Sequence, residues 1–266
     1  AGSVVAVGPE VTAFEEGDDV YGCAGGYPPV PHGALADYMP CDARLLAPMP
    51  GSLSYREAAT LPLVTLTAWE ALRDKAAVQA DQHVLVHGAT GGVGHIGVQL
   101  AADRGCEVTA TASSQRKLDL GAELGATHLV NYETEPVADY VQRLTDEDGF
   151  DVVFDTVAGD NFHRSVEAAR IYGSVATVNP QTVDLGPAYN KGLTVHLVLM
   201  LIPMLHDVRR AHHGAVLRSA ATMVEEGRLR PLVDDRTFSF DEIGAAHAYA
   251  EAHEQTGKVA VTHPDR

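Results

Sequence analysis

The fold of this chain is decided by one stretch of sequence, Val84-Leu85-Val86-His87-Gly88-Ala89-Thr90-Gly91-Gly92-Val93-Gly94. Its first half has the texture of a short buried strand, and its second half is a glycine-rich turn that opens a helical segment, 93–104. Glycines at such a turn let the backbone approach a phosphate group, and the following helix offers N–H groups that no helix carbonyl satisfies. The turn therefore predicts a phosphate-binding loop formed by Ala89, Thr90, Gly91, Gly92, Val93 and Gly94.

A regular alternation of strands and helices surrounds this turn. Strands are predicted at 83–87, 107–112, 128–131, 150–155 and 174–178, and helices at 93–104, 115–124, 137–145 and 162–169. This alternation implies parallel strands joined by right-handed crossovers, so the fold class is α/β with a doubly wound parallel (Rossmann) sheet. Glycines alone are weak evidence, because any tight turn can use them, and Ala89 replaces the first glycine of the common fingerprint. Within this context the turn predicts dinucleotide binding.

The segments on either side of the alternation have a different texture. Short β-branched runs separated by turn-forming residues occupy 1–50, and Ser54-Tyr55-Arg56-Glu57 has the form of a helix capping box. A helix is predicted over 66–75, a mostly helical stretch from Val195 to 226, and β texture returns near the end of the chain. These patterns predict a dinucleotide-binding domain, 66–204, inserted into a second, β-rich domain made of 1–65 and 205–266.

The tip of the second predicted strand bears on the choice of cofactor. An NAD site usually has Asp or Glu there to grip the ribose hydroxyls, whereas this strand runs into Ser113-Ser114-Gln115-Arg116-Lys117. Hydroxyls and cations suit a 2′-phosphate, so NADPH is favoured over NADH. The alternative is that Arg116 and Lys117 are ordinary solvated charges in a first helical turn.

The bulk composition excludes several classes of partner. The chain has 266 residues and a formal net charge of −17, which disfavours nucleic acid and anionic lipid. Its longest apolar run, 193–205, is interrupted by His196 and is too short to span a bilayer. Three scattered cysteines do not form a disulfide framework and suit a reducing cytoplasm.

Several ordered motifs resemble the medium-chain dehydrogenase/reductase superfamily, specifically its zinc-free quinone oxidoreductase (ζ-crystallin-like) branch. They are Gly2–Val11, Gly17–Gly22, Gly33–Tyr38, Leu61–Trp69, Asn131-Tyr132 and Gly257–Val261, together with the glycine turn. The resemblance implies that the β-rich domain is a GroES-like catalytic domain and that the protein is a homodimer. It also implies that Thr67 lies near the nicotinamide and that Ser113, Ser114, Lys117 and Tyr132 hold the 2′-phosphate of NADPH. The reaction it implies is hydride transfer to a quinone or an α,β-unsaturated carbonyl.

Two departures from the family pattern limit which functional residues can be assigned from the resemblance. The family begins with a further stretch ahead of Ala1 that supplies part of the GroES-like domain, so that domain is expected to be incomplete and no catalytic side chain is assigned. The branch can also add an arginine near the C-terminal Gly257-Lys258, and none stands there.

Zinc is not expected. Zinc-dependent relatives carry a cysteine ligand in the segment 61–68, where the matching position is Leu63, and only Cys23 lies between Gly22 and Gly33. The adjacent pair His212-His213 has poor chelating geometry, because neighbours on a helix point about 100° apart.

Two questions remain open: the role of Asp155 and the function of the whole chain. Asp155 ends a predicted parallel strand, where ligands of such sheets bind, but a capping role in the next turn is an equal alternative. For the whole chain, the alternatives to a reductase are an NADPH-binding sensor or another non-catalytic relative, and a zinc-type alcohol dehydrogenase.

Overall fold

The computed structural model describes residues 1–27, 30, 32–178, 182–252 and 255–263. The chain forms two compact units. One consists of Thr67–Leu199, and the other combines Ala1–Leu66 with Met200–Arg266. The boundary between the units falls within the helix α2, Pro62–Trp69.

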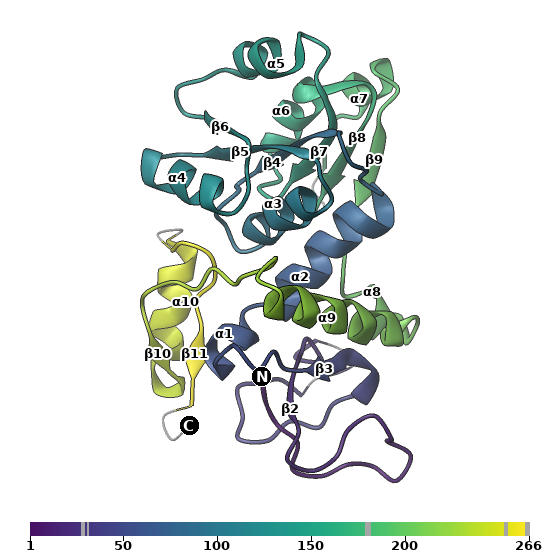
Figure 1. Cartoon of the computed structure of the whole chain (residues 1–266), viewed down its shortest axis with the longest axis vertical. Helices are drawn as coiled ribbons and strands as arrows, with labels where there is room; N and C mark the ends of the chain where they lie inside the picture. The colour runs from purple at the N-terminus through teal and green to yellow at the C-terminus, as the bar shows by residue number, and fades with distance from the viewer. Residues whose placement is uncertain (28–29, 31, 179–181, 253–254, 264–266) are drawn as a thin grey trace. The chain divides into compact units, whose positions relative to one another are not determined.

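The unit 67–199 is built on a six-stranded sheet in which every neighbouring pair is parallel (Figure 1). Its strand order is β6-β5-β4-β7-β8-β9. The strands are β4 His83–His87, β5 Glu107–Ala112, β6 His128–Asn131, β7 Phe150–Asp155, β8 Ala169–Thr177 and β9 Thr194–Leu197. This order reverses direction between β4 and β7, which is the pattern of a doubly wound sheet. The predicted fold class is confirmed.

The sequence did not predict the sixth strand, β9. This segment is only four residues long and lies at the sheet edge, so two of its side chains, Thr194 and Leu197, are exposed. Such a segment shows neither the continuous apolar run of a buried strand nor a clear alternation, and the apolar residues that follow it have helical texture.

Helices cover both faces of this sheet (Figure 1). One face carries α3 Gly94–Asp103 and α4 Gln115–Glu123; the other carries α5 Val137–Thr145, α6 Asn161–Ala168 and α7 Gly186–Asn190. Alternate strand residues serve the two layers, as the pleat of a strand requires. Leu85 and Val153 belong to the core packed with α5, α6 and α7. On the opposite face, Phe154 leaves no room for a side chain at Gly97 of α3, where a Cβ would lie 2.7 Å from its ring.

The side chain of Lys191 caps the C-terminal end of α6. The ammonium group of Lys191 donates to the carbonyl oxygens of Val166, Glu167 and Ala169 at 3.0, 2.7 and 2.8 Å. Three donors thus meet three acceptors, which satisfies carbonyls that the helix itself leaves unpaired at its C-terminus. Burial lowers the pKa of Lys191, and the nearby Glu167 carboxylate opposes that shift.

The predicted helix 66–75 is present but not uniform. α2 is followed by a π-helical segment, Glu70–Lys75. The Lys75 ammonium pairs with Glu70 at 2.8 Å and also donates to the carbonyl of Leu197. The side chain of Lys75 therefore fastens the π-helical segment to the end of β9.

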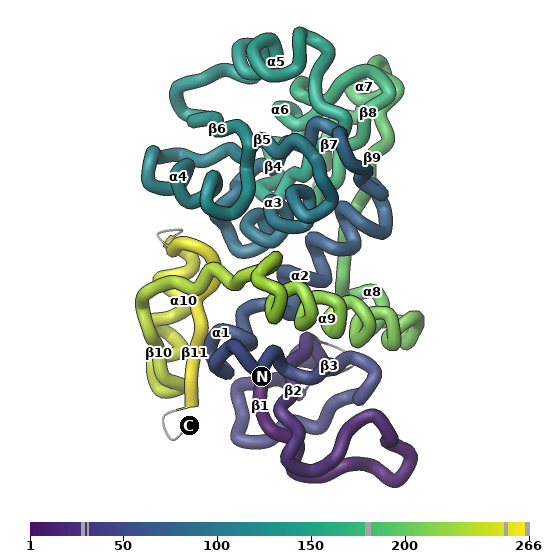
Figure 2. Tube along the Cα trace, viewed as in Figure 1, coloured from purple at the N-terminus to yellow at the C-terminus, as the bar shows by residue number. Residues whose placement is uncertain are grey.

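The second unit is assembled from both ends of the chain, as the colours of Figure 2 show. Its strands are short. They form an antiparallel sheet of β1 Gly2–Ser3, β2 Asp19–Gly22 and β3 Leu46–Pro48, and a parallel pair of β10 Phe238–Ser239 and β11 Val261–Thr262. Its helices are η1 Ala43–Leu45, α1 Tyr55–Ala59, α8 Ile202–His206, α9 Arg210–Glu225, η3 Phe240–Glu242 and α10 Ile243–Glu251. The predicted capping box at the start of α1 is confirmed.

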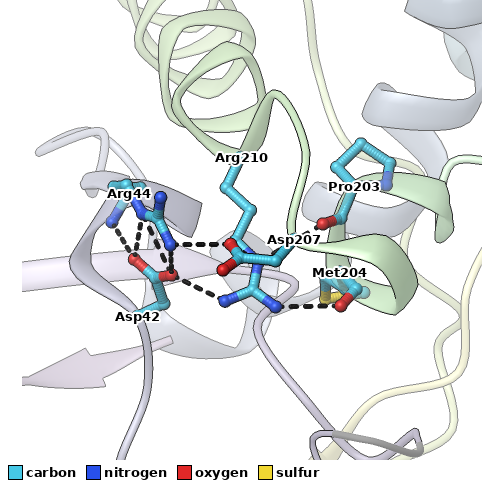
Figure 3. Close-up of polar contacts among 6 residues, drawn as sticks. All are labelled: Asp42, Arg44, Pro203, Met204, Asp207 and Arg210. Atoms are coloured by element: carbon cyan, nitrogen blue, oxygen red, sulfur yellow. Dashed lines mark hydrogen bonds and ion pairs between the residues drawn. The ribbon is translucent and has the colours of Figure 1, made fainter.

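Several polar contacts join the N-terminal and C-terminal halves of this unit. The buried Tyr21 hydroxyl donates to the carbonyl of Leu217 on α9 at 2.6 Å. Nearby, Arg210 at the start of α9 donates to the Asp42 carboxylate at 2.9 Å, and Arg44 pairs with both Asp42 and Asp207 (Figure 3). Along the described ranges no helix, α9 included, is long and apolar enough to cross a membrane.

Candidate dinucleotide site

The candidate site lies where the strand order of the sheet reverses. His87 ends β4 and Asp155 ends β7, and the two are direct neighbours in the ladder between these parallel strands. In open α/β sheets the carboxyl ends of strands at this reversal form the crevice in which ligands bind. The glycine turn 88–94 leaves β4 at this point.

Close backbone approach explains the glycines of the turn. Gly88 adopts a φ of +65°, in the left-handed region that favours glycine. A Cβ on Gly94 would lie 2.1 Å from the carbonyl oxygen of Gly88, and one on Gly91 would lie 3.2 Å from the same atom. The amide of Gly91 donates to this oxygen at 2.9 Å. A side chain at Gly94 would therefore open the turn.

The turn fits the diphosphate of a dinucleotide. The amides of Gly92 and Val93 donate to no backbone acceptor among the described residues, and both residues are partly exposed. They directly precede α3, whose helix dipole favours a negative charge at this end. Ala89 and Thr90 are buried beneath, where the Ala89 amide donates to the Thr111 carbonyl of β5 at 3.1 Å.

A set of side chains below the turn links the ends of three strands. Nδ1 of the buried His87 lies 3.2 Å from Oγ1 of Thr111 on β5. On the other side, the Thr156 hydroxyl after β7 donates to the carbonyl of His87 at 2.6 Å. The entry into the glycine turn is thereby attached to both neighbouring strands.

Asp155 caps the turn that follows β7. Its Oδ1 accepts from the amides of Val157 and Ala158 at 3.1 and 2.9 Å and from Nδ2 of Asn161 at 2.9 Å. Its Oδ2 is buried and has no hydrogen-bond partner among the residues that the structure describes. The structure therefore shows the capping role, and contact between Asp155 and a cofactor stays a prediction.

Burial dominates the electrostatics of His87. Desolvation lowers the pKa of this imidazole to about 4, although the nearby Asp155 carboxylate opposes the shift. The ring is consequently neutral at physiological pH. Its Nε2 is buried and meets no hydrogen-bond partner within the described part of the chain.

The tips of β5 and β6 bring the proposed ribose-end residues together. Ala112 pairs with Asn131 in the ladder, and the Tyr132 amide donates to the Ala112 carbonyl at 3.3 Å. Ser113 and Ser114 follow Ala112 directly, so they share this corner with Tyr132, which is 42% exposed. The Ser114 hydroxyl accepts from the Lys117 amide at 3.5 Å and caps α4. Holding a 2′-phosphate stays a prediction for these residues.

The remaining sequence-based assignments concern α2 and metal ligands. Thr67 is buried within α2, and its proximity to a nicotinamide stays a prediction. Leu63 occupies the same helix and is partly exposed. No group of three or more His, Cys, Asp or Glu side chains within the described ranges has a geometry that could hold a metal ion.

The sequence did not identify four polar residues around the glycine turn, His87, His95, Thr111 and Thr156. All four lie inside or directly after strands and a helix that the sequence pattern predicts to be buried. Their signal is a polar side chain at a position that the pattern predicts to be buried, which demands a hydrogen-bond partner.

Comparisons with known proteins agree with this geometry. Residues 124–261 match a family model described as zinc-binding dehydrogenase. The fold is similar to an alcohol dehydrogenase superfamily protein from Novosphingobium aromaticivorans, with 40% identity and a TM-score of 0.93 over 98% of this chain and 79% of that chain. It is also similar to the quinone oxidoreductase of Pseudomonas syringae pv. Tomato DC3000, with 28% identity and a TM-score of 0.85 over 98% of this chain and 79% of that one.

Among curated proteins, a 2-methylene-furan-3-one reductase from Solanum lycopersicum is 34% identical over 99% of this chain. The chain spans 62% of the length of that reductase. It spans only 14% and 12% of two polyketide synthases that it also matches, from Didymella fabae and Mycobacterium tuberculosis. The chain belongs to the medium-chain dehydrogenase/reductase superfamily, which includes the alcohol dehydrogenases.

Proposed function

We propose that this chain is an NADPH-dependent oxidoreductase that transfers hydride to a quinone or an α,β-unsaturated carbonyl without zinc. The observation that carries the proposal is the glycine turn at the reversal of the sheet. Gly91 and Gly94 let the turn close tightly against the Gly88 carbonyl, and the amides of Gly92 and Val93, just ahead of α3, donate to no backbone acceptor among the described residues. Two relatives support this choice of acceptor by their names: the tomato protein is a reductase of an unsaturated ketone, and the Pseudomonas syringae protein is a quinone oxidoreductase.

In this proposal each part of the site has a separate task. Ala89, Thr90, Gly91, Gly92, Val93 and Gly94 bind the diphosphate through backbone groups and the first turn of α3. Ser113, Ser114, Lys117 and Tyr132 bind the 2′-phosphate, while Asp155 shapes the turn after β7. Thr67 lies against the nicotinamide.

NADPH supplies the hydride when it is bound, and the protein's task is to orient it and exclude water. The proposal assigns no side chain as the proton donor. Zinc independence is supported by Leu63, which offers no ligand atom where zinc-dependent relatives have a cysteine.

The direct test is consumption of NADPH, followed at its nicotinamide absorbance band, with a small quinone and a small enone as acceptors. Turnover with either acceptor supports the proposal. Tight NADPH binding without turnover would instead support the alternative of a nucleotide sensor. Elemental analysis separates the third possibility, because a zinc alcohol dehydrogenase would contain stoichiometric zinc and oxidise a simple alcohol.

We further propose a homodimer. Among the described residues β9 pairs only with β8, so one edge of the sheet is open, and Leu197 on this strand is 62% exposed. Exposed apolar side chains on an unpaired edge favour association with a second copy. Light scattering after size exclusion tests this, and Leu197→Lys should shift the protein toward the monomer.

We also propose that the protein resides in a reducing cytoplasm, since Cys23, Cys41 and Cys106 are all free thiols. Fractionation of the native cell tests that location. Recovery of the protein outside the cytoplasm would contradict it.

A further inference from the structure

The buried histidine of α3 contacts the glycine turn directly. His95 has no exposed surface, and its ring Nδ1 lies 3.0 Å from the carbonyl oxygen of Gly91. The backbone amide of the same residue donates to this oxygen at 3.1 Å. Because a carbonyl oxygen only accepts, Nδ1 carries the hydrogen in this contact. One carbonyl of the turn is therefore held twice by a single residue.

Holding this carbonyl also sets the direction of an amide. The carbonyl of Gly91 and the N–H of Gly92 belong to one planar peptide group and point in opposite directions. With the oxygen directed at His95, the hydrogen of Gly92 is directed away from α3. This amide has no backbone acceptor among the described residues.

Glycines make this restraint necessary. Gly91 and Gly92 are adjacent and can adopt backbone conformations that other residues avoid, so their shared peptide can rotate at little steric cost. A binding group that reorients must lose that freedom when a ligand arrives, whereas a group that is already oriented does not. The contact made by His95 removes this freedom before any ligand binds.

We propose that His95 is a positioning residue that pre-orients the Gly91–Gly92 peptide for the diphosphate of the cofactor. The inference rests on the proposed function, since it needs a dinucleotide on this turn. In this role His95 acts on the ligand through Gly91 and does not touch the ligand itself. Its Nδ1 is the donor in this contact, and its imidazole contributes volume to the core beneath the turn.

Two substitutions separate the donor from the volume. His95→Leu keeps an apolar side chain of similar bulk and removes the donor. His95→Asn places an amide nitrogen close to the position of Nδ1, so it retains the donor while it loses volume. The matched control is Gln99→Leu, because Gln99 lies one turn further along α3 and donates to the carbonyl of His95 at 2.9 Å, away from the glycine turn.

The measurement is the NADPH dissociation constant of the full chain by fluorescence titration, with the free energy of unfolding measured in parallel. We expect His95→Leu to weaken binding about tenfold, which corresponds to one lost hydrogen bond. His95→Asn should restore the affinity to within about twofold of the wild-type value, and Gln99→Leu should lower stability while the dissociation constant stays within the same range.

Each alternative outcome has a definite meaning. Equal NADPH binding by the wild type and His95→Leu would overturn the inference alone. Equal weakening in the Leu and Asn variants, or in Gln99→Leu, would also overturn it by showing that core packing is responsible. A wild-type chain that binds no NADPH would overturn the proposed function and the inference together.

Discussion

His87 and Asp155 are paired neighbours at the carboxyl ends of β4 and β7, and each has one buried side-chain atom that finds no hydrogen-bond partner in the described ranges. An unpaired polar atom in the interior costs free energy, so two of them side by side are unusual. They lie at the reversal of the sheet, directly below the entry to the glycine turn. The consequence that can be measured is a dependence of stability on pH.

Stability should fall as the pH drops from about 6.5, the value of an unfolded-state histidine, to about 4, the lowered pKa of His87. The pKa of this ring is lower in the folded state, so the unfolded chain binds the proton first and gains stability relative to the folded one. His87→Asn should remove this part of the dependence, on the order of 3 kcal/mol. The exposed His163→Asn is the control, and a pH profile in which both variants follow the wild type would refute the prediction.

Gly94→Ala should weaken NADPH binding by more than about tenfold and lower the free energy of unfolding by about 2 kcal/mol. The reason is the 2.1 Å approach of its Cβ to the Gly88 carbonyl, a backbone atom that cannot rotate away. Gly244→Ala is the control. Gly244 lies in the first turn of α10 with nothing within 4 Å of its Cβ, so there the change should stabilise by about 0.5 kcal/mol. Similar effects at the two sites would contradict this interpretation of the turn.

Lys117→Ala should weaken NADPH binding about fivefold while leaving NADH binding unchanged, because only NADPH carries the 2′-phosphate. Arg116→Ala is the matched control, since Arg116 is a neighbouring cation that is more exposed than Lys117. Titration with both nucleotides checks the prediction. If the two variants lose NADPH affinity equally, or neither does, Lys117 is an ordinary solvated charge.

Arg210→Met should destabilise the second unit by about 2 kcal/mol. This guanidinium is only 13% exposed and donates to Asp42 and to the carbonyls of Pro203 and Met204, all of which would lose a donor (Figure 3). Arg44→Met should cost less than about 1 kcal/mol, although Arg44 makes the larger contribution to the lowered pKa of Asp42. Arg44 is 52% exposed, so solvent screens its ion pair. Urea unfolding checks the order, and a larger loss for Arg44→Met would reverse it.

Lowering the pH should also weaken the cluster of Asp42, Arg44 and Arg210. Since hydrogen bonds from Arg44 hold the pKa of Asp42 well below its ordinary value, the stabilisation is present above about pH 4 and is lost as the pH falls further. This range lies below the range of His87, so the two contributions appear as separate steps. Their merging into one step would contradict the separation.

The sheet could be predicted from the sequence wherever its strands are buried. The run Val84-Leu85-Val86 is apolar because both of its faces are covered, and β7 is similar. β9 could not be predicted, because a short edge strand with exposed residues has no such signal. The π-helical segment after α2 could not be predicted either, since its hydrogen-bond pattern leaves no mark in residue types.

The candidate site was predictable in outline only. The turn 88–94 is recognisable because its glycines follow a strand and precede a helix, and local order along the chain is enough to place it. The support of the turn by Thr111 and Thr156 depends on strands that are distant in sequence, so it required the strand order. His95 required a side-chain direction, which no spacing rule for apolar residues supplies.

The reactivity of the Lys191 amine can report on the structure around the C-terminal end of α6. The chain has only four lysines, Lys75, Lys117, Lys191 and Lys258, and the ammonium of Lys191 is fully engaged by three carbonyls. An amine-acylating reagent needs the nitrogen lone pair, so this lysine should react only when the end of α6 opens. The rate at which Lys191 is acylated, relative to that of Lys117 in the same sample, would then measure how often the end of α6 opens locally. This measurement needs no label introduced into the protein beforehand.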